Sequence, residues 1–313
     1  LDGIDNMRIS SIDVPKADDP NTIIGRVLIR LDREDADALE PYVIDLSIKA
    51  VQLFSERYNF TLQSPMVVEL YHDHDDFGVR TVSTPGIGLL GVTFGYLTAM
   101  DSPKARAAGD FHWGSTLWHE MAHVFTLEAT NHLLPRWFSE GLSVYEEWNT
   151  GPLPNRELSM DVLGAIRAAQ LLPIEQLDEG FVRPSYNGQV QVSYMQAGLI
   201  CDFISSRWGH EALVSMLKSF AAKVDTATAL KTAIDMDASA FDQLFLEYLD
   251  TKYDVVLSSL EDLRAAEQQL ERAILLDDWI STEALSRDLI RRYPDRVGAG
   301  NSYLTLADSY RKQ

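Results

Sequence analysis

The chain has 313 residues, of which 46% are hydrophobic and 24% charged, and its formal net charge is −20 at pH 7. This composition is ordinary for a soluble globular protein, and the length suffices for one large or two modest domains. The negative charge argues against the basic surface that nucleic-acid binders need, and equally against docking on anionic lipid. We therefore expect no nucleic acid among the partners.

The sequence constrains the cellular compartment of the protein only weakly. Cys201 is the only cysteine, so no internal disulfide can form, and it lies in an apolar helical stretch where a thiol is usually inert. The most apolar run, residues 86–100, is too short and too glycine-rich to span a membrane. No signal peptide is visible, but the chain starts at Leu1, so a targeting segment could have been cut from a longer protein. The compartment stays open, with a bacterial extracytoplasmic location favoured over the cytoplasm.

The first hundred residues predict a small sheet. Residues 22–31 and 65–71 are rich in β-branched and apolar side chains, which is typical of strands, and a helix is expected between them within 35–58. The glycine-spaced run 86–100 predicts a third strand at an exposed edge, because glycine permits close approach by a partner backbone. The polar stretch HDHDDF after the second strand is expected to be a loop rather than a second metal site.

Strand signals nearly vanish after Ser115, and the rest of the chain is expected to be helical. Three histidines in this part and just before it stand singly, and we interpret His112, His132 and His210 as capping or surface residues. Before the last sixty residues, helices are expected near 115–129, 136–148, 157–169, 192–208, 210–222 and 238–257.

The last sixty residues predict three consecutive amphipathic helices. Alanines stand at close-packing positions, and Pro294 follows the second helix. This pattern resembles tetratricopeptide repeats, which stack helix pairs of about 34 residues. We interpret residues 258–313 as the beginning of a truncated repeat array that can bind a protein partner. The alternative is a helical tail that closes the domain.

The stretch LWHEMAHVF, residues 117–125, has the pattern of a metal site. His119 and His123 are four positions apart, so on a helix both lie on one face and can reach one metal ion. Glu120 would flank that ion, and in the H-E-x-x-H arrangement the glutamate polarises a metal-bound water. The alternative is one turn of an ordinary helix that carries polar residues.

A catalytic zinc needs three protein ligands, and the segment PRWFSEGLSVYEEW supplies a candidate for the third. Pro135 suits a helix start, and Glu140 follows within the first turns. The alternative is a solvent-exposed helix that carries several glutamates. It explains Glu146 well, but it explains Glu140 poorly, because apolar residues flank Glu140 closely. Glu147 lies seven positions beyond Glu140 on the same face, and we expect it to hydrogen-bond a ligand histidine.

With W-x-x-E-G following H-E-x-x-H at this distance, the sequence resembles the gluzincin metallopeptidases, the clan of thermolysin and aminopeptidase N. It is most similar to the bacterial peptidase-MA-like proteins, which share the segments around both motifs and an attached repeat array. The resemblance covers roughly residues 65–250. It implies one zinc ion per chain, with His119, His123 and Glu140 as ligands and Glu120 as the general base.

The same resemblance implies an oxyanion donor and a substrate groove. In aminopeptidase-N-like enzymes a tyrosine some tens of residues after the glutamate ligand stabilises the oxyanion, so Tyr194 is the first candidate and Tyr186 the second. Those aminopeptidases also carry G-x-M-E-N upstream of the first histidine, and its glutamate holds the free amine of the substrate. Here the corresponding stretch has phenylalanine in place of that glutamate. The implied substrate-binding residues are Gly91, Val92, Thr93 and Phe94.

These observations predict an α+β fold. Residues 1–150 would form a small mixed sheet with an exposed edge strand and the zinc-binding helices, 151–257 a helical lower lobe, and 258–313 the antiparallel repeat-like segment. The predicted function is zinc-dependent hydrolysis of polypeptide by a Glu-activated water. An endopeptidase is favoured, because Phe94 cannot pair with an ammonium group. The alternative is a non-catalytic interaction scaffold that binds partners through its repeats and retains the zinc site.

Overall fold

The structure is a computed structural model that describes residues 6–86, 88–107, 109–153, 157–298 and 300–313. It has two compact units, which are described one at a time. The first comprises Leu1–Pro154 and Ala197–Asp235, and the second Asn155–Gln196 and Met236–Gln313. The division into three consecutive parts stays a prediction. None of the helices in the described part of the chain has both the length and the apolar composition that a membrane crossing requires.

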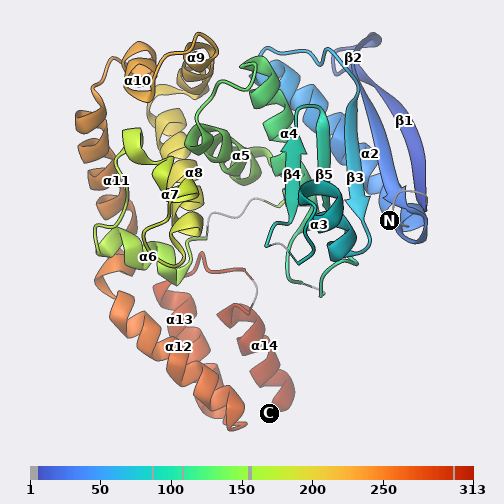
Figure 1. The fold of residues 1–313 in the computed structure, drawn as a ribbon. Helices are drawn as coiled ribbons and strands as arrows, with labels where there is room; N and C mark the ends of the chain where they lie inside the picture. Colours follow the sequence, from blue (N-terminus) through green and yellow to red (C-terminus); the bar gives the residue numbers. More distant parts are fainter. Residues whose placement is uncertain (1–5, 87, 108, 154–156, 299) are drawn as a thin grey trace. The chain divides into compact units, whose positions relative to one another are not determined.

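A mixed sheet is the centre of the first unit (Figure 1). Its five strands run in the order β1-β2-β3-β5-β4, with β3 parallel to both of its neighbours and the two outer pairs antiparallel. Among the described residues β4 therefore pairs on one side only, which confirms the predicted edge strand and the α+β class. The strands are β1 (Met7–Lys16), β2 (Asp19–Asp32), β3 (Met66–Tyr71), β4 (Gly91–Phe94) and β5 (Leu97–Asp101).

The run 86–100 contains a hairpin instead of the single strand that the sequence predicts. β4 and β5 pair from Gly91 opposite Met100 to Phe94 opposite Leu97, so two residues form the turn. The first of these, Gly95, has a φ of +57°, which glycine adopts without a steric penalty. The spacing of glycines thus marks a turn as well as an edge.

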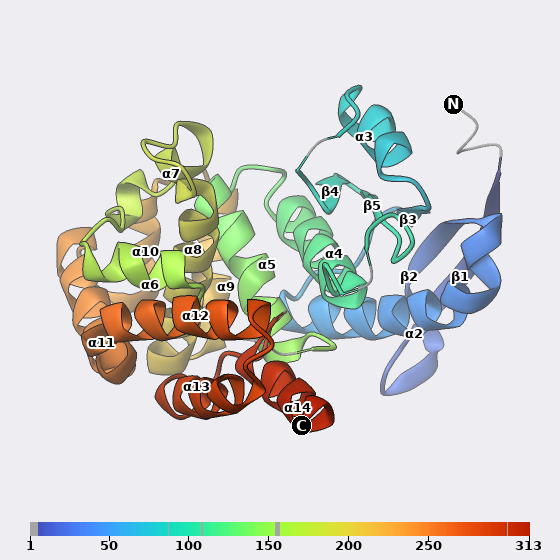
Figure 2. The same ribbon diagram turned by 90° about the horizontal axis from the view of Figure 1, so that it is seen from below.

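Helices cover both faces of the sheet. Phe54 of α2 packs edge-on against Trp118 and Phe125 of α4, with ring centroids 5.2 and 5.7 Å apart. On the other face, Phe77 of α3 joins a buried apolar cluster with residues of the sheet. Figure 2 shows α3 on one side of the strands and α2 on the other. The bounds of these helices are α2 (Arg33–Arg57), α3 (His74–Val82) and α4 (Trp113–Ala129).

The polar stretch HDHDDF is not the loop that the sequence predicts, because α3 begins within it. Asp73 caps this helix with its side chain. Nδ1 of His72 lies 3.1 Å from Oδ2 of Asp35, and Nδ1 of His74 lies 2.9 Å from Oδ2 of Asp101. Each histidine thus binds a different buried carboxylate, so the two do not converge on one metal.

The other helices of the first unit pack closely around α5. A Cβ atom added at Gly141 would lie 2.7 Å from the carbonyl oxygen of Ala197 and 3.0 Å from Sγ of Cys201, so glycine permits this contact of α5 with α8. Cys201 is buried, and burial raises the pKa of its thiol, as expected for an inert cysteine. These helices are α5 (Arg136–Thr150), the later part of α8 (Gln189–Trp208), α9 (His210–Ala221) and α10 (Thr226–Ile234).

The described part of the second unit is helical. Its last three helices, α12 to α14, confirm the three predicted near the C-terminus, but their likeness to tetratricopeptide repeats stays a prediction. The Tyr293 hydroxyl after α13 donates to the carbonyl of Leu158 at 3.1 Å, and burial raises the pKa of Tyr293 to about 12. The elements are α6 (Met160–Arg167), η1 (Ile174–Gln176), α7 (Glu179–Val182), the first part of α8, α11 (Ala238–Ser258), α12 (Leu260–Leu275), α13 (Trp279–Arg292) and α14 (Ser302–Lys312).

Glu146 is completely buried, which corrects its expected place on a solvated face. Its Oε1 accepts hydrogen bonds from Nε of Arg57 at 2.9 Å and from the hydroxyl of Tyr58 at 2.7 Å, and its Oε2 accepts one from Thr150 at 2.8 Å. The guanidinium of Arg57 also lies 3.1 Å from Nδ1 of His210, so that histidine belongs to this network rather than to the surface. The ion pair links α2 to α5.

Replacing Glu146 with glutamine tests this ion pair. We expect Glu146→Gln to lower the free energy of unfolding by about 3 kcal/mol, because it leaves the largely buried Arg57 without its counter-charge. Urea denaturation measures the change. Lys49→Met is the control, because it breaks the ion pair between Lys49 and Asp45, two side chains that are 61% and 59% exposed. Such exposed ion pairs contribute less than about 1 kcal/mol to stability. Equal losses in the two variants would contradict the assigned role.

Candidate metal centre

The candidate site is built on two consecutive helices, α4 and α5. His112 caps α4, as predicted, because its Nδ1 accepts a hydrogen bond from the main-chain N–H of Ser115 at 3.0 Å. Pro135 occupies the N-cap position of α5. Between the helices, Asn131 and His132 have φ values of +51° and +60°, a left-handed conformation that reverses the chain within a few residues. His132 is exposed, as predicted.

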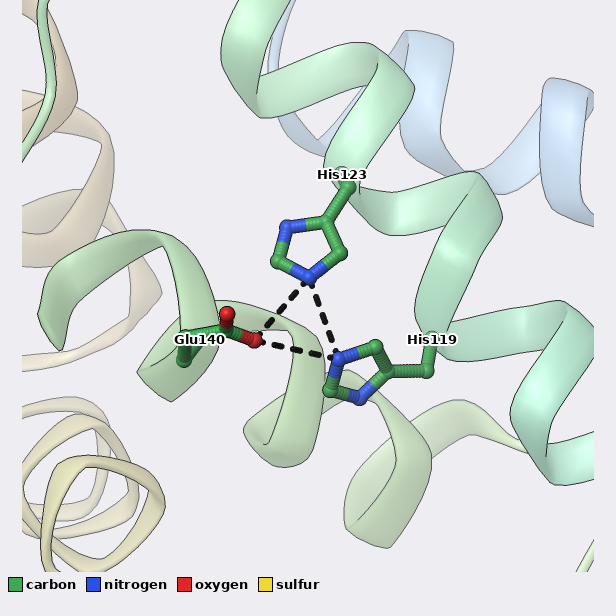
Figure 3. Close-up of side chains that lie close together, drawn as sticks. All are labelled: His119, His123 and Glu140. Carbon is green, nitrogen blue, oxygen red and sulfur yellow. Dashed lines mark hydrogen bonds and ion pairs between the residues drawn. The ribbon is translucent and has the colours of Figure 1, made fainter. Parts of the chain in front are cut away.

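The side chains of His119 and His123 extend from α4 toward Glu140 on α5 (Figure 3). The two Nε2 atoms lie 3.1 Å apart, and Oε2 of Glu140 lies 3.1 Å from Nε2 of His123 and 3.4 Å from that of His119. Within the described ranges, this is the one group of three or more His, Cys, Asp or Glu whose ligand atoms all lie within 4.8 Å of one another. The fold thus brings together the three predicted ligands.

The other ring nitrogen of each histidine has its own partner. Nδ1 of His119 lies 2.5 Å from Oε1 of Glu147, and Nδ1 of His123 lies 2.9 Å from Oγ of Ser139. A carboxylate only accepts hydrogen bonds, so Nδ1 of His119 carries a proton, and Nε2 is the ring nitrogen left for a metal ion, which would take the place of a proton there. Sequence reasoning places Glu147 beside a ligand histidine but misses Ser139. A histidine that binds a metal through one ring nitrogen needs a hydrogen-bond partner for the other, and this requirement could have pointed to Ser139.

Burial and charge shift the pKa values of these groups in opposite directions. Burial lowers the pKa of His119, but its bonds to Glu140 and Glu147 outweigh this effect and leave the pKa well above its ordinary value. Burial would raise the pKa of Glu140, but the charges and hydrogen bonds of His123 and His119 hold it far below the usual range. Arg136, which sequence reasoning also misses, places Nε 3.6 Å from Oε1 of Glu140. Glu140 therefore stays ionised, as a carboxylate ligand of a cation must be.

Glu120 points from α4 to the edge strand β4. It is buried, and its Oε2 accepts a hydrogen bond from the hydroxyl of Thr93 at 2.7 Å. Burial raises the pKa of Glu120, although the charges of His123 and His119 and the bond from Thr93 act in the opposite direction. A buried carboxylate with a raised pKa beside a candidate metal centre is suited to accept a proton from water.

The residues of β4 alternate between the two faces of the sheet. Gly91 and Thr93 face Glu120, whereas Val92 packs against the buried cluster on the other face. Phe94 shares the face of Val92, and it is 52% exposed. Substrate binding by these four residues stays a prediction.

The two candidate oxyanion donors belong to the second unit. Tyr194 lies on α8, and its ring packs edge-on against Phe181 with centroids 5.1 Å apart. The hydroxyl of Tyr186 is buried and has no hydrogen-bond partner among the described residues. Their roles stay predictions, and the choice between them stays open.

One comparison with known proteins shows a family. Residues 58–251, more than half of the chain, match the sequence profile of the Peptidase MA superfamily. A search of the curated proteins finds no match. Among solved structures, the chain is similar to an aminopeptidase N family protein from Idiomarina loihiensis, with a TM-score of 0.44 and 12% sequence identity. The match covers 76% of this chain and 46% of that chain, so it spans less than half of that protein's length.

Proposed function

The chain belongs to the Peptidase MA superfamily, and on this premise we propose that it is a zinc-dependent peptidase. The observation that carries the proposal is the meeting of three ligand atoms, Nε2 of His119, Nε2 of His123 and Oε2 of Glu140. Each of the three side chains is largely buried, and each is placed by a regular helix.

This donor set fits zinc. A tetrahedral zinc site with two imidazole nitrogens and one carboxylate oxygen has bonds of about 2.0–2.2 Å, which puts the ligand atoms about 3.3–3.6 Å apart. The three separations here are 3.1, 3.1 and 3.4 Å. Oε2 of Glu140 and Nε2 of each histidine face the same point, so a cation at that point could take the place of the protons between them.

The remaining side chains supply the other parts of a hydrolysis. When bound, zinc would polarise the scissile carbonyl and lower the pKa of a water in the site. Glu120 would take a proton from the attacking water and deliver it to the leaving amine nitrogen. Glu147 and Ser139 would hold the imidazole rings with Nε2 toward the centre. Donation of a hydrogen bond to the oxyanion by Tyr194, or by Tyr186 in its place, stays a prediction from the sequence.

The substrate would be an internal segment of polypeptide that adds as a strand to β4. Phe94 offers no charge to a free amine. Glu69, an acid in strand β3 of the same sheet, is buried and already accepts bonds from Arg30 at 2.5 Å and Tyr71 at 2.8 Å. Glu147 is engaged by His119. Because Glu69 and Glu147 already have hydrogen-bond partners, these contacts support an endopeptidase: an aminopeptidase must pair the ammonium group of its substrate with an acid or with carbonyl groups.

Zinc affinity tests the donor set. We expect Glu140→Ala to weaken zinc binding by at least about a hundredfold, and Glu147→Gln by about ten- to a hundredfold, because the second change only frees the His119 ring. Competition with a chelator measures both. Glu128→Gln is the matched control, because Glu128 lies on α4 but pairs with His132 at 3.1 Å. Parental affinity in both test variants would contradict the assignment.

Peptide cleavage tests the general base. We expect Glu120→Gln to retain zinc and to lower kcat at least about a hundredfold, because the amide cannot accept a proton from water. A quenched fluorescent peptide gives the rate, and Glu128→Gln should cleave it at the parental rate. Cleavage by Glu120→Gln at the parental rate would show that another group moves the proton. Bound zinc with no cleavage by the unaltered protein would favour the non-catalytic scaffold.

Acetylation of a test peptide tests the substrate class. We expect an N-terminally acetylated peptide to be cleaved within about twofold of the free peptide, because a cation over the Phe94 ring would gain only about 0.5–2 kcal/mol. Mass spectrometry of the products locates the cleaved bond. Loss of cleavage on acetylation, together with release of single residues from the amino end, would replace the endopeptidase by an aminopeptidase.

A further inference from the structure

The edge strand β4 and the metal-site helix α4 are joined by a side-chain hydrogen bond. The hydroxyl of Thr93 lies 2.7 Å from Oε2 of Glu120 and 3.0 Å from the carbonyl oxygen of the same residue. Because Glu120 is buried, water has little access to replace this bond. β4 therefore holds the Glu120 carboxylate through one of its two oxygens, Oε2.

Gly91 shapes the same face of the strand two residues earlier. A Cβ atom at this position would lie 2.7 Å from Oε1 and 2.8 Å from Cγ of Glu120, closer than real Cβ atoms approach other atoms. The glycine thus leaves the space that the Glu120 side chain occupies. β4 presents a hydrogen-bond donor at Thr93 and no side chain at Gly91, and both features are fitted to one carboxylate.

A second threonine, Thr98, contacts the Thr93 hydroxyl, so the direction of each hydrogen bond can be assigned. Oγ1 of Thr98, on the neighbouring strand β5, lies 3.2 Å from Oγ1 of Thr93, and Thr98 is fully buried. A hydroxyl has one proton, and Glu120 as a carboxylate can only accept. Thr93 therefore donates to Glu120 and accepts from Thr98. Oε1 of Glu120 has no hydrogen bond from any residue that the structure describes, so its lone pairs are available to a water molecule.

We propose that Thr93 is a positioning residue, which holds Glu120 through Oε2 so that Oε1 is the oxygen that receives the proton. This inference rests on the proposed role of Glu120 as general base. The proton leaves the attacking water for Oε1 and passes from there to the amine nitrogen of the leaving peptide, while Thr93 keeps its own proton throughout. The strand that would bind the substrate backbone thereby also orients the base.

Two substitutions separate the hydroxyl from the shape of the side chain. Thr93→Val keeps the β-branched shape that suits a strand but removes the donor, and Thr93→Ser keeps the donor. We expect Thr93→Val to lower kcat about tenfold, with KM within about twofold of the parental value, because the lost bond to a charged group orients the base. Thr93→Ser should recover most of the rate. Zinc content should be unchanged in both.

Thr98→Val is the matched control. It also removes a hydroxyl from this hairpin, but it leaves the bond from Thr93 to Glu120 in place, so we expect a loss in kcat of no more than about threefold. Equal losses in Thr98→Val and Thr93→Val, or no rescue by Thr93→Ser, would mean that the hairpin is merely disturbed. Either result would overturn the proposal.

Crystal structures of the three Thr93 forms decide the same question without an activity assay. The Glu120 carboxylate should have one orientation, against β4, with threonine or serine at position 93, and should leave β4 or adopt several orientations with valine. An unmoved Glu120 in Thr93→Val would overturn the proposal. If the unaltered protein cleaved no peptide, the proposed function would fail, but this structural comparison would still test whether Thr93 positions Glu120.

Discussion

Three electron-pair donors held within 3.4 Å of one another are the constraint around which the first unit is arranged. Nε2 of His119, Nε2 of His123 and an oxygen of Glu140 can lie this close only where protons or a cation among them offset the repulsion of their lone pairs. The helices can hold them in place because the outer side of each histidine is bonded, to Glu147 in one case and to Ser139 in the other. The candidate ligands and the side chains that support them thus come from two helices joined by a short loop.

The position of α5 depends on a second charge interaction. Glu146 and Glu147 are adjacent, but Glu146 binds Arg57 of α2 in the interior, whereas Glu147 binds His119. One helix therefore connects the buried ion pair to the candidate metal centre. On the other side of α4, Thr93 of the edge strand binds Glu120. The proposed base and the proposed ligands are thus held by different neighbours, so one can be altered while the other is retained.

The sequence predicts those parts of the site that follow from the period of a single helix. His119 and His123 share a face because they are four apart, and Glu140 and Glu147 share one because they are seven apart. The edge position of β4 could also be predicted from the spacing of its glycines. These features depend on residues close in sequence, so they can be read without knowing how the chain packs.

Other features depend on which helices and strands pack together, and the local sequence pattern does not predict these contacts. Glu146 resembles a solvated residue in sequence, and only the packing of α2 brings Arg57 to it. His72 and His74 resemble a polar loop, but Asp35 and Asp101 come from distant segments. β1 was missed because adjacent serines interrupt the alternation of its apolar residues, and its pairing with β2 supplies the stability that its own pattern does not indicate. The bond between Thr93 and Glu120 likewise joins two separate elements.

Zinc content and peptide cleavage, measured on the same preparation, test whether the protein is a zinc-dependent peptidase. The protein is stripped with a chelator and then reloaded with increasing amounts of zinc. The expected result is that cleavage of an internal peptide bond appears in proportion to bound zinc and reaches its maximum at one zinc ion per chain. Cleavage that persists in the stripped protein, or one tightly bound zinc with no cleavage of any peptide in a diverse library, would contradict it.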